Sequence, residues 1–127
     1  MMERHYENKF AYFRISNQIV FLDIKEDVVL DLDAAAAITS DRMQFQEGKS
    51  YPVLFNISRL ADTSKSGRDY MAHYGWFLTK RVGILARPFR AYAIAKFYLL
   101  LSKPKVATEI FIEEPVAIDF LISRTNQ

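Results

Sequence analysis

The sequence predicts an α/β fold built on a mixed, mostly parallel β-sheet. The chain has 127 residues, half of them hydrophobic and a quarter charged, which suits one globular domain. Residues 51–57 include an unbroken apolar run, as expected for a central strand covered on both faces. Beyond an initial hairpin, apolar strand-like runs alternate with helix-like segments, and this alternation favours right-handed crossovers between parallel strands.

The hairpin is predicted near the N-terminus. Residues 10–16 are rich in aromatic side chains, and residues 19–25 are a second apolar run. Asn17 and Gln18 between them suit a tight turn. We expect residues 1–8 to be a flexible N-terminus, which leaves residues 10–16 as the exposed, antiparallel edge of the sheet.

The first helix is predicted for residues 32–46. Asp31 can cap it, because its carboxylate accepts hydrogen bonds from free amides of the first turn. Gly48 is a natural stop. The strand of residues 51–57 and a polar loop of residues 58–66 follow.

The second half continues the alternation of helix and strand. Pro88 and Pro115 each suit the start of a helix. The overall order is β-β-α-β-α-β-α-β-α in one domain, residues 1–127. The remaining elements are a helix at about 67–78, a strand at 82–86, a helix at 88–101, a strand at 106–112 and a helix from 114.

This order, together with residues 51–57 (Tyr-Pro-Val-Leu-Phe-Asn-Ile) and the stretch from Lys103 to Leu121, resembles the STAS-like domains related to bacterial anti-sigma-factor antagonists, the SpoIIAA-like group. Asn56 stands where the central strand of that family commonly carries an aspartate. The resemblance covers nearly the whole chain. It implies a STAS-like fold and a regulatory, protein-binding role.

Signalling members of that family carry an Asp-Ser-Ser-Gly segment before the second helix, and a partner kinase phosphorylates its second serine. The nearest segment here contains Asp62, Ser64, Ser66 and Arg68, with Lys65 in place of the glycine. The resemblance thus makes Ser64 or Ser66 a candidate phosphoacceptor. The residues themselves allow two interpretations: a serine that caps the helix, or an anion site at its N-terminus with Arg68 as a donor.

Basic residues dominate residues 70–108, which contain no Asp or Glu. Such a segment suits a solvated surface or a patch for an acidic partner. The net charge of +2 is small for a dedicated nucleic-acid binder, so we do not expect nucleic acid as a partner. The predicted interaction surface combines the loop with the start of the third helix; its candidate residues are Ser58, Arg59, Arg87 and Arg90.

Aromatic residues are dense between residues 70 and 98. An aromatic stripe at helical spacing usually belongs to the core, but it also suits an oligomer interface or an apolar pocket. The architecture is also loosely similar to Sec14-type lipid-transfer domains. The candidate lining of such a pocket consists of Tyr70, Tyr74, Trp76 and Tyr92.

The chain has no cysteine and two histidines, so disulfides, thiolate catalysis and cysteine metal sites are excluded. We expect no catalytic residues, no metal and no cofactor. We expect a cytoplasmic location away from membranes. The predicted function is a non-enzymatic regulatory or protein-interaction module that forms a homodimer. A small apolar-ligand or lipid carrier is the alternative.

Overall fold

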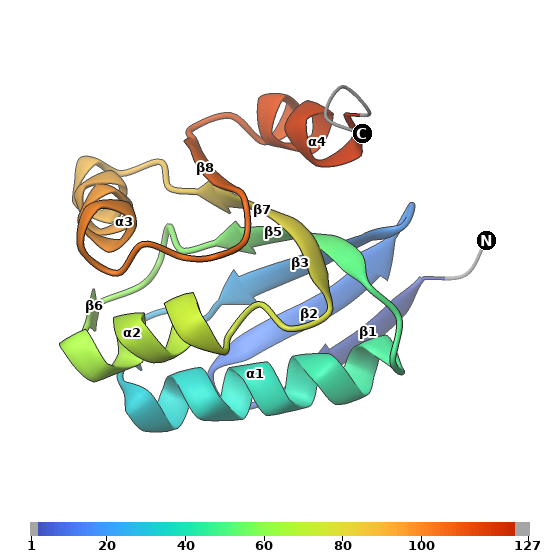
Figure 1. Cartoon of the computed structure of the whole chain (residues 1–127), viewed down its shortest axis with the longest axis horizontal. Coiled ribbons are helices and arrows are strands. Elements are labelled where there is room, and N and C mark those ends of the chain that lie inside the picture. Colours follow the sequence, from blue (N-terminus) through green and yellow to red (C-terminus); the bar gives the residue numbers. More distant parts are fainter. Residues whose placement is uncertain (1–2, 124–127) are drawn as a thin grey trace.

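A computed structural model describes residues 3–123. Its main sheet has six strands in the order β1-β2-β3-β5-β7-β8. Strands β1, β2 and β3 pair antiparallel, and β3, β5, β7 and β8 pair parallel (Figure 1). The strands are β1 (Arg4–Glu7), β2 (Ala11–Ser16), β3 (Ile19–Ile24), β5 (Tyr51–Asn56), β7 (Thr79–Leu85) and β8 (Thr108–Phe111). The predicted mixed, mostly parallel α/β fold is therefore confirmed.

Four helices and a small second sheet complete the chain. Strands β4 (Val29–Leu30) and β6 (Asp62–Thr63) pair parallel beside the main sheet. The helices are α1 (Leu32–Gln46), α2 (Lys65–His73), α3 (Phe89–Leu101) and α4 (Glu114–Ile122). Helix α1 has the predicted bounds, and Asp31 caps it by accepting from the Ala34 amide at 3.0 Å.

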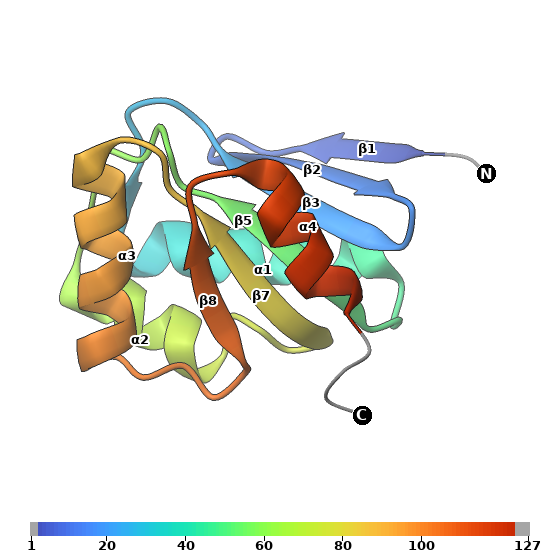
Figure 2. The same cartoon turned by 90° about the horizontal axis from the view of Figure 1, so that it is seen from above.

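The helices bury two separate cores. Helices α1, α2 and α3 share the larger core with one face of the sheet, through small side chains such as Ala35, Ala72 and Ala95. Helix α4 covers the opposite face over β5, β7 and β8, with Ala117 and Leu121 buried (Figure 2). Strands β1 and β2 extend beyond α4.

The N-terminus corrects two expectations. Within the segment predicted as flexible, residues 1–8, the described part is ordered, because Arg4–Glu7 forms strand β1 and Arg4 and Tyr6 contact Phe45 of α1. Met1 and Met2 lie outside the described residues. Strand β2 is consequently paired on both sides and is not the sheet edge. The two edges of the main sheet are β1 and β8.

Helix α2 also differs from its prediction. It begins at Lys65 and ends at His73, whereas the pattern predicts residues 67–78. The buried guanidinium of Arg42 on α1 stabilises the turn that follows the end of α2. It donates to the carbonyls of Gly75 and Phe77 at 2.8 and 2.7 Å. A cation from another helix therefore satisfies carbonyls beyond the end of α2. Burial lowers the pKa of Arg42 to about 10.

Candidate functional site

The start of α2 is fixed by the segment before it. Ser64 caps the helix, its Oγ accepting from the Gly67 amide at 3.0 Å. The Ser64 amide in turn donates to the Leu30 carbonyl at 3.2 Å. Gly67 packs so tightly on strand β4 that a Cβ there would lie 2.1 Å from the Leu30 oxygen. The predicted helix cap is thus present, and it holds the tip formed by residues 58–68 against the body of the fold.

The candidate phosphoacceptors lie next to each other at this tip. The Oγ atoms of Ser64 and Ser66 are 3.2 Å apart. Ser66 is exposed, whereas Ser64 is half-buried and its hydroxyl is engaged in the cap. Asp62 is exposed on β6, and Arg68 donates to the Thr63 Oγ at 2.9 Å. The four predicted residues therefore lie within one short, ordered segment.

Helix α3 borders the tip, and three arginines connect the two. The Arg90 guanidinium donates to the Ala61 carbonyl at 2.6 Å. The Arg87 amide donates to the Ser58 Oγ at 3.2 Å, and its Nε donates to the Ile112 carbonyl at 3.3 Å. The Arg68 guanidinium carbon lies 4.9 Å from the centre of the Phe97 ring.

Two grooves flank the start of α3, and Phe89 forms the ridge between them. The first measures about 470 Å³ and runs between the tip and α3; it is lined by Asp62, Thr63, Arg68, Phe89, Arg90, Ala93, Ile94 and Phe97. The second measures about 460 Å³ and runs between α3 and β8; it is lined by Arg87, Phe89, Tyr92, Ile110 and Ile112. Phe89 is 86% exposed. The structure thus places Ser58, Arg87 and Arg90 at one surface.

Arg59 is the predicted surface residue that lies elsewhere. It lines a separate depression of about 70 Å³ with Tyr12, Asp23, Ile24 and Asn56. Burial raises the pKa of Asp23, and the positive charge of Arg14 opposes that shift. Sequence reasoning missed Asp23, because a single aspartate near the end of an apolar strand carries no motif.

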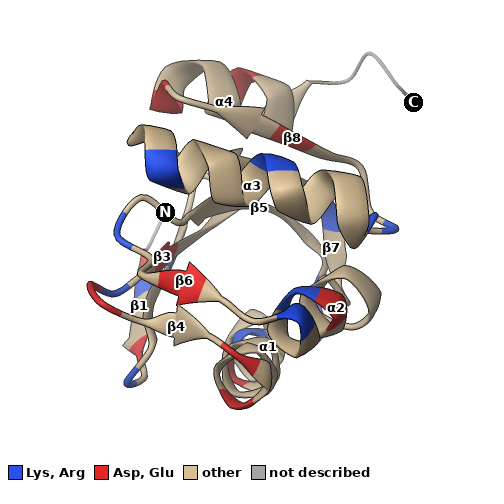
Figure 3. Ribbon diagram, turned by 90° about the vertical axis from the view of Figure 1, so that its left-hand side faces the viewer, with Lys and Arg blue, Asp and Glu red and all other residues tan. Residues whose placement is uncertain are grey.

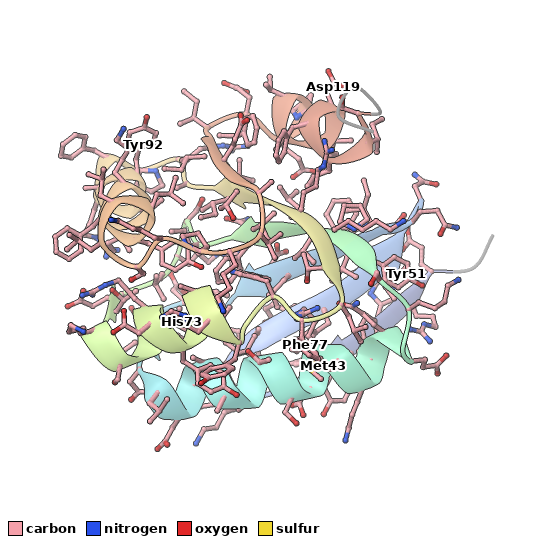
Figure 4. The ribbon with its side chains drawn as sticks, viewed as in Figure 1. Met43, Tyr51, His73, Phe77, Tyr92 and Asp119 are labelled. Atoms are coloured by element: carbon pink, nitrogen blue, oxygen red, sulfur yellow. The ribbon has the colours of Figure 1, made fainter. Side chains whose placement is uncertain are left out.

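The predicted apolar pocket is not assembled. Trp76 is buried and donates to the Tyr98 hydroxyl at 2.9 Å, whereas Tyr74 is 62% exposed. Tyr70 packs on Tyr74, with ring centres 5.2 Å apart, and Tyr92 lies on α3 beside the second groove (Figure 4). The four side chains therefore do not line one cavity.

A small, partly open pocket does lie beneath α2 and α3. Its lining includes Leu60, Met71 and Ile84, and it measures about 20 Å³. That volume holds about one water molecule, whereas pockets for drug-sized ligands measure roughly 300–1,000 Å³. Among residues 3–123, no group of three or more His, Cys, Asp or Glu side chains could hold a metal ion. No helix in the same range is long and apolar enough to span a membrane.

Comparison with known proteins places this architecture in a family. The family described as "Domain of unknown function (DUF7793)" matches residues 13–125. The chain belongs to this family. No curated protein matches the DUF7793 chain.

A solved structure confirms the fold. It is an uncharacterised protein of the DUF3478 family from Shewanella loihica PV-4, described as having a SpoIIAA-like fold. The two are 12% identical, the match covers 94% of this chain and 92% of the other, and the TM-score is 0.54. The predicted SpoIIAA-like architecture is therefore confirmed, and at this identity the likeness concerns the fold alone.

Proposed function

We propose that this DUF7793 protein is a non-enzymatic, regulatory protein-interaction module. Its recognition surface combines the tip, residues 58–68, with the outer face of α3. The observation that carries the proposal is the exposure of large apolar side chains along that face. Phe89, Phe97 and Leu100 are 86, 49 and 66% exposed, at spacings of eight and three residues.

Helix α3 is apolar on both sides, and this is unusual for a helix at a protein surface. Its inner face is buried through Ala91, Ala95 and Tyr98. Its outer face carries Arg90 and Lys96 but also offers aromatic and leucine side chains to water, where a mostly polar face is expected. Contiguous exposed apolar side chains of this kind mark interaction surfaces in soluble proteins. A second protein that covers α3 would remove this surface from water.

Regulation through the tip is part of the proposal. A phosphate on Ser66 would lie in the first turn of α2, where the helix dipole favours negative charge. Modification of Ser64 would instead remove the hydroxyl that caps the Gly67 amide. We therefore favour Ser66 as the acceptor. Intact-mass measurement of the protein from its native cells, with Ser66→Ala as control, tests this step; an unmodified mass under all growth conditions would contradict it.

The protein-binding role is tested by affinity capture with matched variants. The baits are the wild type, a Phe89→Ser/Phe97→Ser double variant and Phe77→Ser, whose side chain is 65% exposed well away from Tyr92 and α3 (Figure 4). We expect one partner to be recovered with the wild type and Phe77→Ser and lost with the double variant. Equal recovery by all three baits would contradict the proposal, as would a bait that carries a small molecule and no protein.

Two further parts of the proposal have their own tests. We propose that any homodimer uses edge strand β1, because β2 is paired on both sides. Light scattering at high concentration that gives a monomer mass would exclude such a dimer. Activity in a broad hydrolase and phosphatase screen, above that of a heat-treated control, would contradict the non-enzymatic role.

A further inference from the structure

The grooves beside Phe89 also define the chemistry of the partner. Three arginines and one carboxylate line the two grooves. Helix α3 itself carries Arg90 and Lys96 and no acidic residue (Figure 3). The single carboxylate, Asp62, is exposed on β6. The lining of the two grooves therefore carries a net positive charge.

These guanidinium groups are held in place before any partner arrives. Arg68 is fixed by Thr63 and the Phe97 ring, Arg90 by a backbone carbonyl of the tip, and Arg87 by a carbonyl beyond β8. The Nε of Arg68 is buried and has no hydrogen-bond partner within residues 3–123. A guanidinium has five N–H donors, so each of these arginines keeps donors for a carboxylate.

Resting on the proposed function, we infer that the grooves bind an acidic amphipathic segment of a partner protein. Its apolar side chains occupy the grooves on either side of Phe89, and its carboxylates face Arg68, Arg87 and Arg90. The apolar side chains from Phe89 to Leu101 extend along roughly 18 Å of helix, at 1.5 Å per residue. That length suits about three turns of a partner helix packed along α3.

A second copy of the chain fits this surface less well. In a two-fold dimer through α3, the same patch meets itself, so Arg87, Arg90 and Lys96 of both copies would approach one another. An anionic membrane would also attract basic and aromatic side chains. However, the ridge lies between two shallow grooves that can take individual side chains, and two of the arginines are tied to backbone carbonyls.

The test uses three labelled 18-residue peptides with the full-length protein. The first is an acidic amphipathic helix of Glu, Leu and Phe, the second replaces every Glu by Lys, and the third scrambles the acidic sequence so that no apolar face remains. Fluorescence anisotropy measures affinity. We expect the acidic amphipathic peptide to bind at least about tenfold more tightly than either control, and its binding to weaken as salt rises.

Variants assign the binding to the grooves. Phe89→Ser should weaken binding of the acidic peptide by about tenfold or more, while Phe77→Ser should leave it unchanged. Arg87→Glu with Arg90→Glu should reverse the preference and favour the lysine peptide. Circular dichroism of each variant confirms that it is folded. Equal binding of the acidic and lysine peptides, binding that Phe89→Ser leaves intact, or no binding would each overturn the inference.

The capture experiment separates this inference from the proposed function. A partner lost with Phe89→Ser/Phe97→Ser, combined with no preference for the acidic peptide, would overturn the acidic chemistry and leave the interaction role standing. Sedimentation with phosphatidylcholine–phosphatidylserine vesicles tests whether the surface binds an anionic membrane instead. Vesicle binding that requires Phe89, without peptide binding, would also overturn the inference.

Discussion

Replacing Gly67 by alanine tests how α2 is docked on the rest of the fold. Gly67 lies in the first turn of α2 with an ordinary helical backbone, so helix propensity alone predicts that alanine stabilises the protein by about 1 kcal/mol. The packing predicts the opposite. The new Cβ would lie 2.1 Å from the Leu30 oxygen and 2.9 Å from two backbone carbons, and none of these atoms can rotate away.

Relief of this clash requires α2 to move away from β4 by about 1 Å. Overpacking of this kind costs about 1–3 kcal/mol, and loss of the hydrogen bond from the Ser64 amide to Leu30 adds about 1 kcal/mol. After the gain in helix propensity is subtracted, Gly67→Ala should lower the free energy of unfolding by about 1–3 kcal/mol.

The assay is equilibrium unfolding in urea, followed by circular dichroism and by the fluorescence of Trp76, which is the only tryptophan and is buried. Gly83→Ala is the matched control, because a Cβ at Gly83 makes only ordinary contacts, the nearest at 3.5 Å. It should change the free energy of unfolding by less than about 1 kcal/mol. A Gly67→Ala protein that is as stable as the wild type would refute the reasoning.

Three further changes probe buried groups. Arg42→Ala should cost about 3–5 kcal/mol, because it leaves a cavity and two carbonyls without a donor; urea unfolding measures this, and a loss below about 1 kcal/mol would contradict it. Burial raises the pKa of Tyr98 from 10.0 to about 12, so its contribution to stability is present below pH 10.0 and lost as the pH rises through about 12. Between these values the wild type should lose about 2–3 kcal/mol more than Tyr98→Phe, and parallel stability curves would be the contrary result. Burial also raises the pKa of Asp23 above 3.8, so Asp23→Asn should stabilise the protein at neutral pH. The gain in stability should shrink as the pH falls toward 3.8. Thermal melts at both pH values test this, and a destabilised variant at neutral pH would be the contrary result.

The elements that sequence reasoning located well carry their own local signals. Helix α1 has a capping aspartate at its start and a glycine just past its end, and Asn17 and Gln18 both adopt the positive φ angles that a tight hairpin turn requires. Strand β5 was evident from its apolar run. Each of these signals lies within a few residues of the element that it defines.

The elements that sequence reasoning missed depend on distant partners. Strand β1 is charged and largely exposed, and it forms because β2 offers it a pairing edge. Strands β4 and β6 have two residues each and exist only as a pair. At the site, a serine cap was predictable from Ser64, whereas the burial of Trp76 and the exposure of Phe89 were not. Both are aromatic residues within the same dense stretch of sequence.

The sequence by itself therefore determined the fold class, most of the elements and the capped tip before α2, because caps, turns and apolar periodicity act over short distances along the chain. The tertiary structure decided which aromatic side chains face water and which arginines lie beside them. Burial and groove formation depend on how α2, α3 and β8 pack together, which no local pattern within any one of these segments specifies. The candidate recognition surface around Phe89 exists only through that packing.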